Sequence, residues 1–313
     1  MSIAFIFPGQ GSQAVGMGAE LAKAYASARA VFDEVDAALG QNLSKIMWEG
    51  PEGELTLTEN AQPALMAVSL AAMHVLGEKG VKLPGTITYV AGHSLGEYSA
   101  LAASGALSLA DTARLLKTRG RAMQDAVPVG EGAMAALLGA DLAQARELAK
   151  AAAEGEICEA ANDNAPGQVV ISGSKTAIEH AVALAPKFGA RRAVLLPVSA
   201  PFHCALMRPA AEAMREALAA IEIKSPAVPL VANVLAEAVT DPEEIRTRLV
   251  EQVTGMVRWR ETMLYLKGNG VDTVYEVGAG RVLSGIARRF DGIEAKSVGT
   301  PEELDAAAAA LAA

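Results

Sequence analysis

One short segment restricts the possible folds of this chain more than any other: Gly92-His93-Ser94-Leu95-Gly96. It matches the pattern G-x-S-x-G and lies between an apolar segment, 86–91, and a helix-forming segment that begins at Glu97. In this context the pattern predicts a sharp strand-to-helix turn, in which the glycines allow two backbones to approach closely. The serine hydroxyl is then exposed near the positive end of the helix, where the N–H of Leu95 can stabilise an oxyanion. With 29 glycines in the chain the pattern can also arise by chance, but the flanking strand and helix favour a serine nucleophile, Ser94.

Segments with the apolar character of strands alternate with segments of helical periodicity along most of the chain. We expect strands at 3–7, 87–91, 228–232 and 273–277, and helices that include 19–39 and 61–79. Strands that alternate with helices indicate a mainly parallel sheet covered on both faces. The sequence therefore predicts an α/β fold with a hydrolase-like, parallel-sheet large domain.

One part of the chain departs from this alternation. Between 132 and 197 we expect the following order: strand 134–138, helix 141–154, strand 157–161, turn 162–167, strand 168–172, helix 176–188 and strand 191–196. This is the ferredoxin-like order, and its length suits a small inserted domain. We therefore expect a ferredoxin-like small domain at 128–198, and a large catalytic domain made of 1–127 and 199–313.

The composition excludes several classes of protein. Apolar residues make up 51% of the chain, which is enough for a large core, and the formal net charge of −9 argues against a nucleic-acid-binding surface. The two cysteines, Cys158 and Cys204, form no CxxC motif or Cys/His cluster, so we expect neither a disulfide framework nor a metal site. No signal peptide and no apolar segment long enough to span a membrane is evident, so the expected location is the cytoplasm.

A serine nucleophile needs a base within hydrogen-bond reach, and the chain has four histidines. His74 lies in an apolar helix and His180 in the middle of a helix of the small domain, while the ring of His93 would normally point away from the neighbouring Ser94. His203 follows a loop where the chain returns to the large domain, and residues that line clefts are common on such loops. The residues alone favour His203 as the base.

Two other patterns suggest different chemistry. Gly9-Gln10-Gly11-Ser12-Gln13-Ala14 fits the dinucleotide fingerprint G-x-G-x-x-A, with Asp33 at a suitable distance. However, Asp33 lies in a predicted helix rather than at the end of a strand, which argues against nicotinamide binding. Cys204 lies beside His203, but neighbouring side chains diverge in direction, so a Cys–His pair is not implied.

Arg119 is expected to face inward. The segment 108–123 is helical, and Arg119 lies about 60° from the apolar stripe that contains Leu116, whereas Arg114 and Arg121 point away from it. A buried guanidinium without a partner is costly, so it should meet an anion, either a substrate carboxylate or an internal Asp or Glu. The residues alone leave these two alternatives open.

Together these features resemble the malonyl-CoA:acyl carrier protein transacylase family over nearly the whole chain. The matching motifs, in order, are 7–13 (FPGQGSQ), 92–98 (GHSLGEY), Arg119, Asn162, 166–170 (PGQVV), 201–203 (PFH) and 275–278 (YEVG). After Gln252 the chain departs from the family pattern, with 253–257 (VTGMV) where relatives commonly have an Asn-Pro turn.

The resemblance implies an enzyme that transfers malonyl groups from malonyl-CoA to acyl carrier protein for fatty acid synthesis, with no metal or redox cofactor. It implies a pair formed by Ser94 and His203, with the main-chain carbonyl of Gln252 in place of a third side chain. The oxyanion hole would be formed by the N–H groups of Gln10 and Leu95. The substrate-binding residues would be Arg119, on the malonyl carboxylate, together with Phe202, His93 and Asn162.

Three alternatives remain at this stage. A serine esterase or thioesterase could use the same turn, although it would not need an inward arginine. A polyketide or malonate-decarboxylase acyltransferase would share every motif given above. An inactive module that only binds a carrier protein would not become acylated on Ser94. Phe202 is also expected to crowd an α-methyl branch, which favours malonyl over methylmalonyl.

Overall fold

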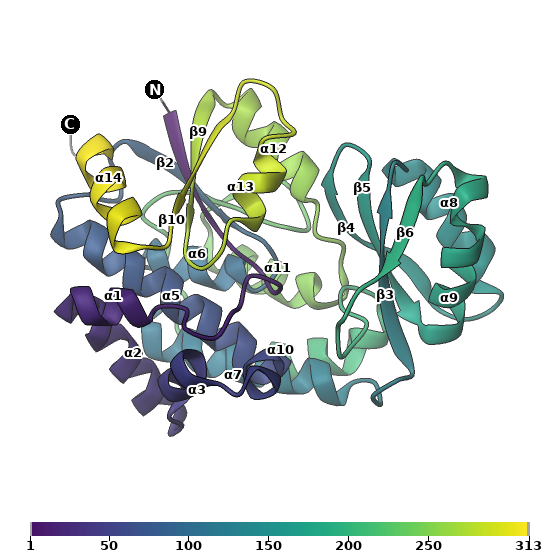
Figure 1. Ribbon diagram of the computed structural model, residues 1–313, viewed down its shortest axis with the longest axis horizontal. Helices are drawn as coiled ribbons and strands as arrows, with labels where there is room; N and C mark the ends of the chain where they lie inside the picture. The colour runs from purple at the N-terminus through teal and green to yellow at the C-terminus, as the bar shows by residue number, and fades with distance from the viewer. Residues whose placement is uncertain (1, 312–313) are drawn as a thin grey trace.

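The computed structural model describes residues 2–311, which form a larger and a smaller α/β part lying side by side (Figure 1). The larger part is built on a six-stranded sheet of order β10-β9-β1-β2-β7-β8, in which the first five strands are parallel and β8 is antiparallel. The strands are β1 (Ser2–Phe7), β2 (Ile87–Gly92), β7 (Leu230–Val231), β8 (Ala238–Val239), β9 (Val271–Val277) and β10 (Glu294–Val298).

Helices cover both faces of this sheet. They are α1 (Ala19–Ala24), α2 (Ala26–Leu39), α3 (Leu43–Glu49), α4 (Glu52–Thr56), α5 (Thr58–Glu78), α6 (Gly96–Ala103), α7 (Leu109–Asp125), α10 (Arg208–Ala219), α11 (Pro242–Thr254), α12 (Trp259–Gly268), α13 (Val282–Ala287) and α14 (Pro301–Leu311), with a 3₁₀ turn η2 at Ala205–Met207. None of the helices within 2–311 has both the length and the apolar character needed to cross a bilayer.

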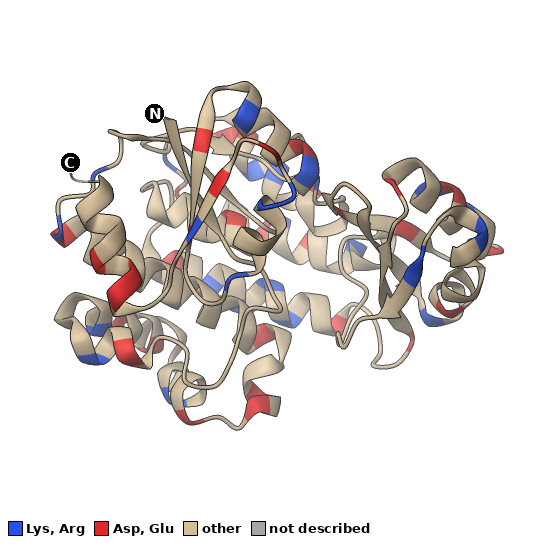
Figure 2. Ribbon diagram, turned by 45° about the horizontal axis from the view of Figure 1, so that its top comes forward, with Lys and Arg blue, Asp and Glu red and all other residues tan. Residues whose placement is uncertain are grey.

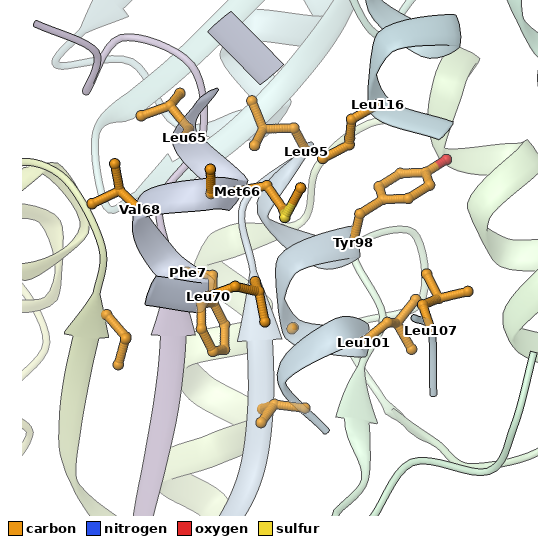
Figure 3. Close-up of a cluster of buried hydrophobic side chains, with 14 of the residues drawn as sticks. Phe7, Leu65, Met66, Val68, Leu70, Leu95, Tyr98, Leu101, Leu107 and Leu116 are labelled. Carbon is orange, nitrogen blue, oxygen red and sulfur yellow. The ribbon is translucent and has the colours of Figure 1, made fainter. Parts of the chain in front are cut away.

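The side chains of β1 alternate between two hydrophobic clusters, as the geometry of a strand requires. Phe5 and Phe7 contribute to the larger cluster, which α5, α6 and α7 also fill, and Figure 3 shows Phe7 among side chains of these helices. Ala4 and Ile6 contribute to a second cluster with Trp259 of α12. Because both faces of β1 are buried from Ile3 to Phe7, this part of the strand is entirely apolar, which is typical of a central parallel strand.

The smaller part is a four-stranded antiparallel sheet of order β4-β5-β3-β6 with two helices packed on it. Its elements are β3 (Gly132–Leu138), α8 (Leu142–Ala153), β4 (Cys158–Ala165), β5 (Gln168–Ser174), α9 (Lys175–Leu184), η1 (Ala185–Phe188) and β6 (Arg192–Leu195). This order of elements and strands is the ferredoxin-like one. The predicted fold class, a hydrolase-like large domain with an inserted ferredoxin-like small domain, is confirmed.

Two local expectations were wrong. The expected helix at 19–39 is interrupted at Tyr25, whose backbone is extended and whose hydroxyl donates a hydrogen bond to Asp305 of α14. The expected turn at 162–167 is only Pro166 and Gly167, because β4 continues to Ala165. Asn162 and its neighbours have low strand propensity, but β4 is held on one side by β5 and on the other by a bridge to Val257.

Candidate active site

Ser94 occupies a sharp turn between β2 and α6, at the carboxyl end of the central parallel strands. Its φ angle is 54°, a left-handed conformation that side chains rarely adopt. A Cβ atom on Gly92 would lie 1.9 Å from the carbonyl carbon of Gly96, and one on Gly96 would lie 2.3 Å from the carbonyl oxygen of Phe7. Because no larger residue fits at either position, the predicted reason for the two glycines is confirmed.

The side chain of Asn233, in the loop after β7, holds this turn in place. Its Oδ1 accepts a hydrogen bond from Ser94 N at 2.8 Å, and its Nδ2 donates one to the carbonyl of Gly92 at 2.7 Å. Asn233 could not be identified from the sequence, because it is distant from Ser94 in the chain and belongs to no catalytic motif.

His203 is the histidine that reaches the serine. Its Nε2 lies 2.8 Å from Ser94 Oγ, and its Nδ1 lies 2.9 Å from the carbonyl oxygen of Gln252 and 3.1 Å from that of Gly255. Because carbonyl oxygens only accept hydrogen bonds, Nδ1 carries the proton, and the lone pair of Nε2 is directed at the serine hydroxyl. The segment 253–257, which departs from the family pattern, thus still supplies one acceptor for the imidazole, the carbonyl of Gly255.

The surroundings of His203 keep its imidazole neutral. Burial is the main cause and the nearby Arg119 guanidinium adds to it, and together they lower the pKa of His203 from 6.5 to about 3. A neutral imidazole that points its free nitrogen at a hydroxyl can act as a general base.

Arg119 lies inward on α7, as the periodicity predicted, and it is only 1% exposed. Its Nη2 donates to Ser94 Oγ at 3.2 Å and to Gln252 Oε1 at 2.8 Å, and its Nη1 donates to Gln62 Oε1 at 2.8 Å. The guanidinium carbon lies 5.6 Å from the ring centre of Tyr98. All the hydrogen-bond acceptors of Arg119 within residues 2–311 are uncharged, so the structure provides no carboxylate ion pair for it.

A cavity of about 770 Å³ opens in front of Ser94 and His203, between the two sheets. Gln10 and His93 line it from the large domain, Asn162 from β4 and Phe202 from the loop before His203. Arg119 does not line the cavity, because its side chain lies behind Ser94 among the two glutamines.

The sequence of residues 4–296 matches the acyl transferase domain family. The chain belongs to this family. A curated relative, the malonyl CoA-acyl carrier protein transacylase of Bacillus subtilis (strain 168), is 46% identical over 97% of this chain and 96% of its own. The expected membership of the malonyl-CoA:acyl carrier protein transacylases is thus confirmed.

Solved structures agree with this assignment. The acyl-carrier-protein-S-malonyltransferase of Bartonella henselae has a TM-score of 0.98 and 55% identity, with all of both chains covered. A malonyl-transacylase in complex with a type II PKS acyl-carrier protein has a TM-score of 0.96 and 42% identity, covering 99% of this chain and 100% of its own.

Two backbone N–H groups of the acyltransferase are candidates for an oxyanion hole: that of Gln10, which lines the same cavity as Ser94, and that of Leu95, the next residue after the serine. Within residues 2–311, neither Gln10 N nor Leu95 N donates a hydrogen bond to a backbone or side-chain acceptor. Both belong to the turns that follow parallel strands, β1 for Gln10 and β2 for Leu95. Free donors at this position are what an oxyanion hole requires.

His93 is held beside the cavity rather than against the serine hydroxyl. Its Nε2 lies 2.8 Å from Asn164 Oδ1, and its ring centre lies 5.5 Å from that of Trp259. Burial lowers the pKa of His93, so this ring is also neutral. Asn164 was missed in the sequence because it was assigned to a turn.

The remaining candidates lie away from the reacting atoms. Asp33 is on α2 and pairs with Arg29 at 2.9 Å, so it is not at the end of a strand as a dinucleotide site requires. The thiol of Cys204 points to the carbonyl of Pro201, and burial raises its pKa to about 11. Within residues 2–311, no three His, Cys, Asp or Glu side chains are grouped to hold a metal ion.

Proposed function

We propose that this acyltransferase moves a malonyl group from malonyl-CoA to the phosphopantetheine thiol of acyl carrier protein, through a malonyl ester on Ser94. The reaction supplies fatty acid synthesis. Family membership and the relatives' names support the substrates, and the hydrogen-bonded pair of Ser94 and His203 supports the chemistry.

In the first half-reaction, His203 Nε2 takes the proton from Ser94 Oγ as the oxygen attacks the thioester carbonyl. The N–H groups of Gln10 and Leu95 stabilise the resulting oxyanion. The carbonyl of Gln252 stabilises the imidazolium through Nδ1–H. When the tetrahedral intermediate collapses, the C–S bond breaks, and the coenzyme A sulfur leaves with the proton from His203.

The second half-reaction repeats these steps in reverse order. His203 takes the proton from the phosphopantetheine thiol, whose sulfur attacks the ester carbonyl. The same oxyanion hole stabilises the intermediate, and Ser94 leaves with the proton returned by His203. This sequence uses only groups of the chain and its two substrates.

The observation that carries the choice of malonyl is Arg119. A fully buried guanidinium lies 3.2 Å from the nucleophile, and its acceptors are all neutral. An esterase would be disadvantaged by such a charge, whereas a carboxylate on the acyl group would stabilise it through two parallel hydrogen bonds. We infer that Arg119 turns from the glutamines to this carboxylate, while His93, Asn162 and Phe202 enclose the acyl group.

Selectivity tests this assignment. Arg119→Ala should lower kcat/KM for malonyl-CoA by about 10²-fold or more and lower that for acetyl-CoA far less, because only the malonyl group loses an ionic contact. Arg119→Lys should restore only part of the loss, since an ammonium cannot form the two parallel bonds. An unchanged malonyl-to-acetyl ratio in Arg119→Ala would contradict the proposal.

The destination of the malonyl group separates transfer from hydrolysis. With labelled malonyl-CoA, we expect the label on acyl carrier protein, and free malonate as the main product would indicate a thioesterase. A solved relative in complex with a type II PKS carrier makes a polyketide carrier the second candidate acceptor. Comparing kcat/KM for the two kinds of carrier protein decides between them.

Acyl carrier proteins are acidic, and we propose that this acidic enzyme receives them on a local basic surface. The surface consists of Lys187, Arg191, Arg192, Arg288 and Arg289. Arg289 donates to Gln168 of β5 at 2.8 Å, Gly139 N donates to the carbonyl of Gly167 at 2.8 Å, and Arg191 N donates to the carbonyl of Leu138 at 2.8 Å. These contacts support one continuous surface across the junction of the two domains.

We place the domain boundaries at 127/128 and 198/199, which is consistent with loops before β3 and after β6. We also propose a cytoplasmic location, with which the two free, buried cysteines are compatible.

A further inference from the structure

Glu97, in the first turn of α6, is a fully buried carboxyl group that none of the steps above uses. Its Oε2 accepts a hydrogen bond from Gln252 Nε2 at 2.6 Å and a longer one from Asn233 N at 3.4 Å. Its Oε1 has no hydrogen-bond partner within residues 2–311. Buried polar atoms are normally hydrogen-bonded, so a buried carboxyl group with one unpaired oxygen is unusual and suggests a specific role.

The partner of Glu97 connects every part of the catalytic group. The carbonyl oxygen of Gln252 accepts from His203, its side-chain Oε1 accepts from Arg119, and its Nε2 donates to both Ser94 O and Glu97. A rotated amide would place its NH₂ group against the guanidinium and its oxygen against two other acceptors. Glu97 therefore stabilises the one amide orientation in which Gln252 can receive Arg119.

We propose that Glu97 is a positioning residue that aligns the base and the receptor for the malonyl carboxylate through Gln252. This inference rests on the function proposed above. If it holds, losing the acceptor at Glu97 lets the Gln252 amide rotate or move. The guanidinium of Arg119 then loses the Gln252 oxygen that fixes its position. The main-chain carbonyl of Gln252, which orients His203, shifts as well.

The acceptor at Oε2, rather than the negative charge, carries this role. Both hydrogen bonds of the carboxyl group end on Oε2, so a glutamine whose carbonyl oxygen takes that place can keep them, with its NH₂ group at the free Oε1 position. Burial raises the pKa of Glu97 to about 7, although Gln252, Asn233 and Arg119 of α7 oppose this rise. Tyr98, the next residue on α6, is the other titratable group beside it. A protonated carboxyl with its hydrogen on Oε1 still accepts at Oε2.

The test compares Glu97→Gln, which keeps the acceptor, with Glu97→Met, which removes it at similar volume. Glu97→Asp, which withdraws the carboxylate by one methylene, is a milder variant in case Glu97→Met does not fold. Each variant is assayed with malonyl-CoA and acetyl-CoA, and its melting temperature is measured. Wild-type malonyl transfer is measured first, because its absence would refute the proposed function rather than this inference.

The expected result is a change of selectivity as well as of rate. In Glu97→Met the malonyl-to-acetyl ratio of kcat/KM should fall about tenfold, and in Glu97→Asp the ratio should also fall, but less. In Glu97→Gln the ratio should stay within about threefold of the wild-type value. The matched control is Glu276 of β9, another fully buried glutamate, which accepts from Leu283 N and Ser284 N and touches none of these residues. Glu276→Gln should lower the melting temperature and leave the ratio unchanged.

Two outcomes would overturn the proposal. The first is a folded Glu97→Met or Glu97→Asp variant whose ratio equals that of wild type, which would make Glu97 a purely structural residue. The second is a Glu97→Gln variant that loses as much selectivity as Glu97→Met, which would assign the effect to charge rather than to the acceptor.

Discussion

At the scale of single residues, the site places a neutral base and a buried cation around one serine. His203 and Arg119 both contact Ser94 Oγ, and Gln252 contacts both of them. The cation disfavours protonation of the imidazole, so the base is free at neutral pH.

This arrangement predicts how acylation depends on pH. The pKa of His203 is lowered from 6.5 to about 3, so the imidazole is neutral at any pH well above 3. It loses its function as a base only when the pH falls toward 3. The rate of Ser94 acylation, measured by quenching the reaction at short times, should therefore not fall between about pH 7.5 and about pH 5.5, because the base is not protonated in this range. Burial raises the pKa of Glu97 to about 7, so its titration could also change the rate in this pH range. Measuring Glu97→Gln, which cannot titrate, in parallel separates this effect from protonation of His203. A rate that halves near pH 6.5 in both proteins would contradict the account.

At the scale of elements, the sequence predicted the framework better than the connections. The central strands β1, β2 and β9 were found because most of their residues are buried and each strand contains several apolar side chains. The edge strand β10 was missed because three of its five residues are polar and only Val298 is fully buried. Arg119 was found from periodicity, whereas Asn233 and Gln62 depend on contacts between distant segments, which a local pattern does not contain.

The turn between β2 and α6 gives a direct test of this local structure. Gly96→Ala should lower stability by about 3 kcal/mol or more, because the added Cβ would collide with the backbone of Phe7 and neither backbone can yield cheaply. Gly77→Ala is the matched control: Gly77 lies in α5 with open space around it, and alanine there should raise stability by up to about 1 kcal/mol. Urea unfolding measures the change in the free energy of unfolding for both variants. Equal changes would contradict the close backbone contact at Gly96.

At the scale of the whole molecule, two acidic proteins have to meet. The net charge of this chain is −9, and Figure 2 shows acidic and basic residues intermingled over both domains. Reversing the charge of Arg191 and Arg289 should raise KM for acyl carrier protein, most strongly at low salt, and leave KM for malonyl-CoA unchanged. Arg215→Glu on α10, which also reverses an exposed arginine, is the control and should change neither value. Equal increases for both substrates would argue against a docking surface.

The central claim is that Ser94 carries the malonyl group, and mass spectrometry of the protein after brief exposure to malonyl-CoA tests it most directly. The account predicts one added malonyl group, located on the peptide that contains Ser94 and released when acyl carrier protein is supplied. It predicts no adduct in Ser94→Ala, and formation about 10²–10⁴-fold slower in His203→Ala. A malonyl adduct that persists in Ser94→Ala, or a wild-type enzyme that transfers malonyl without ever carrying it, would contradict the account.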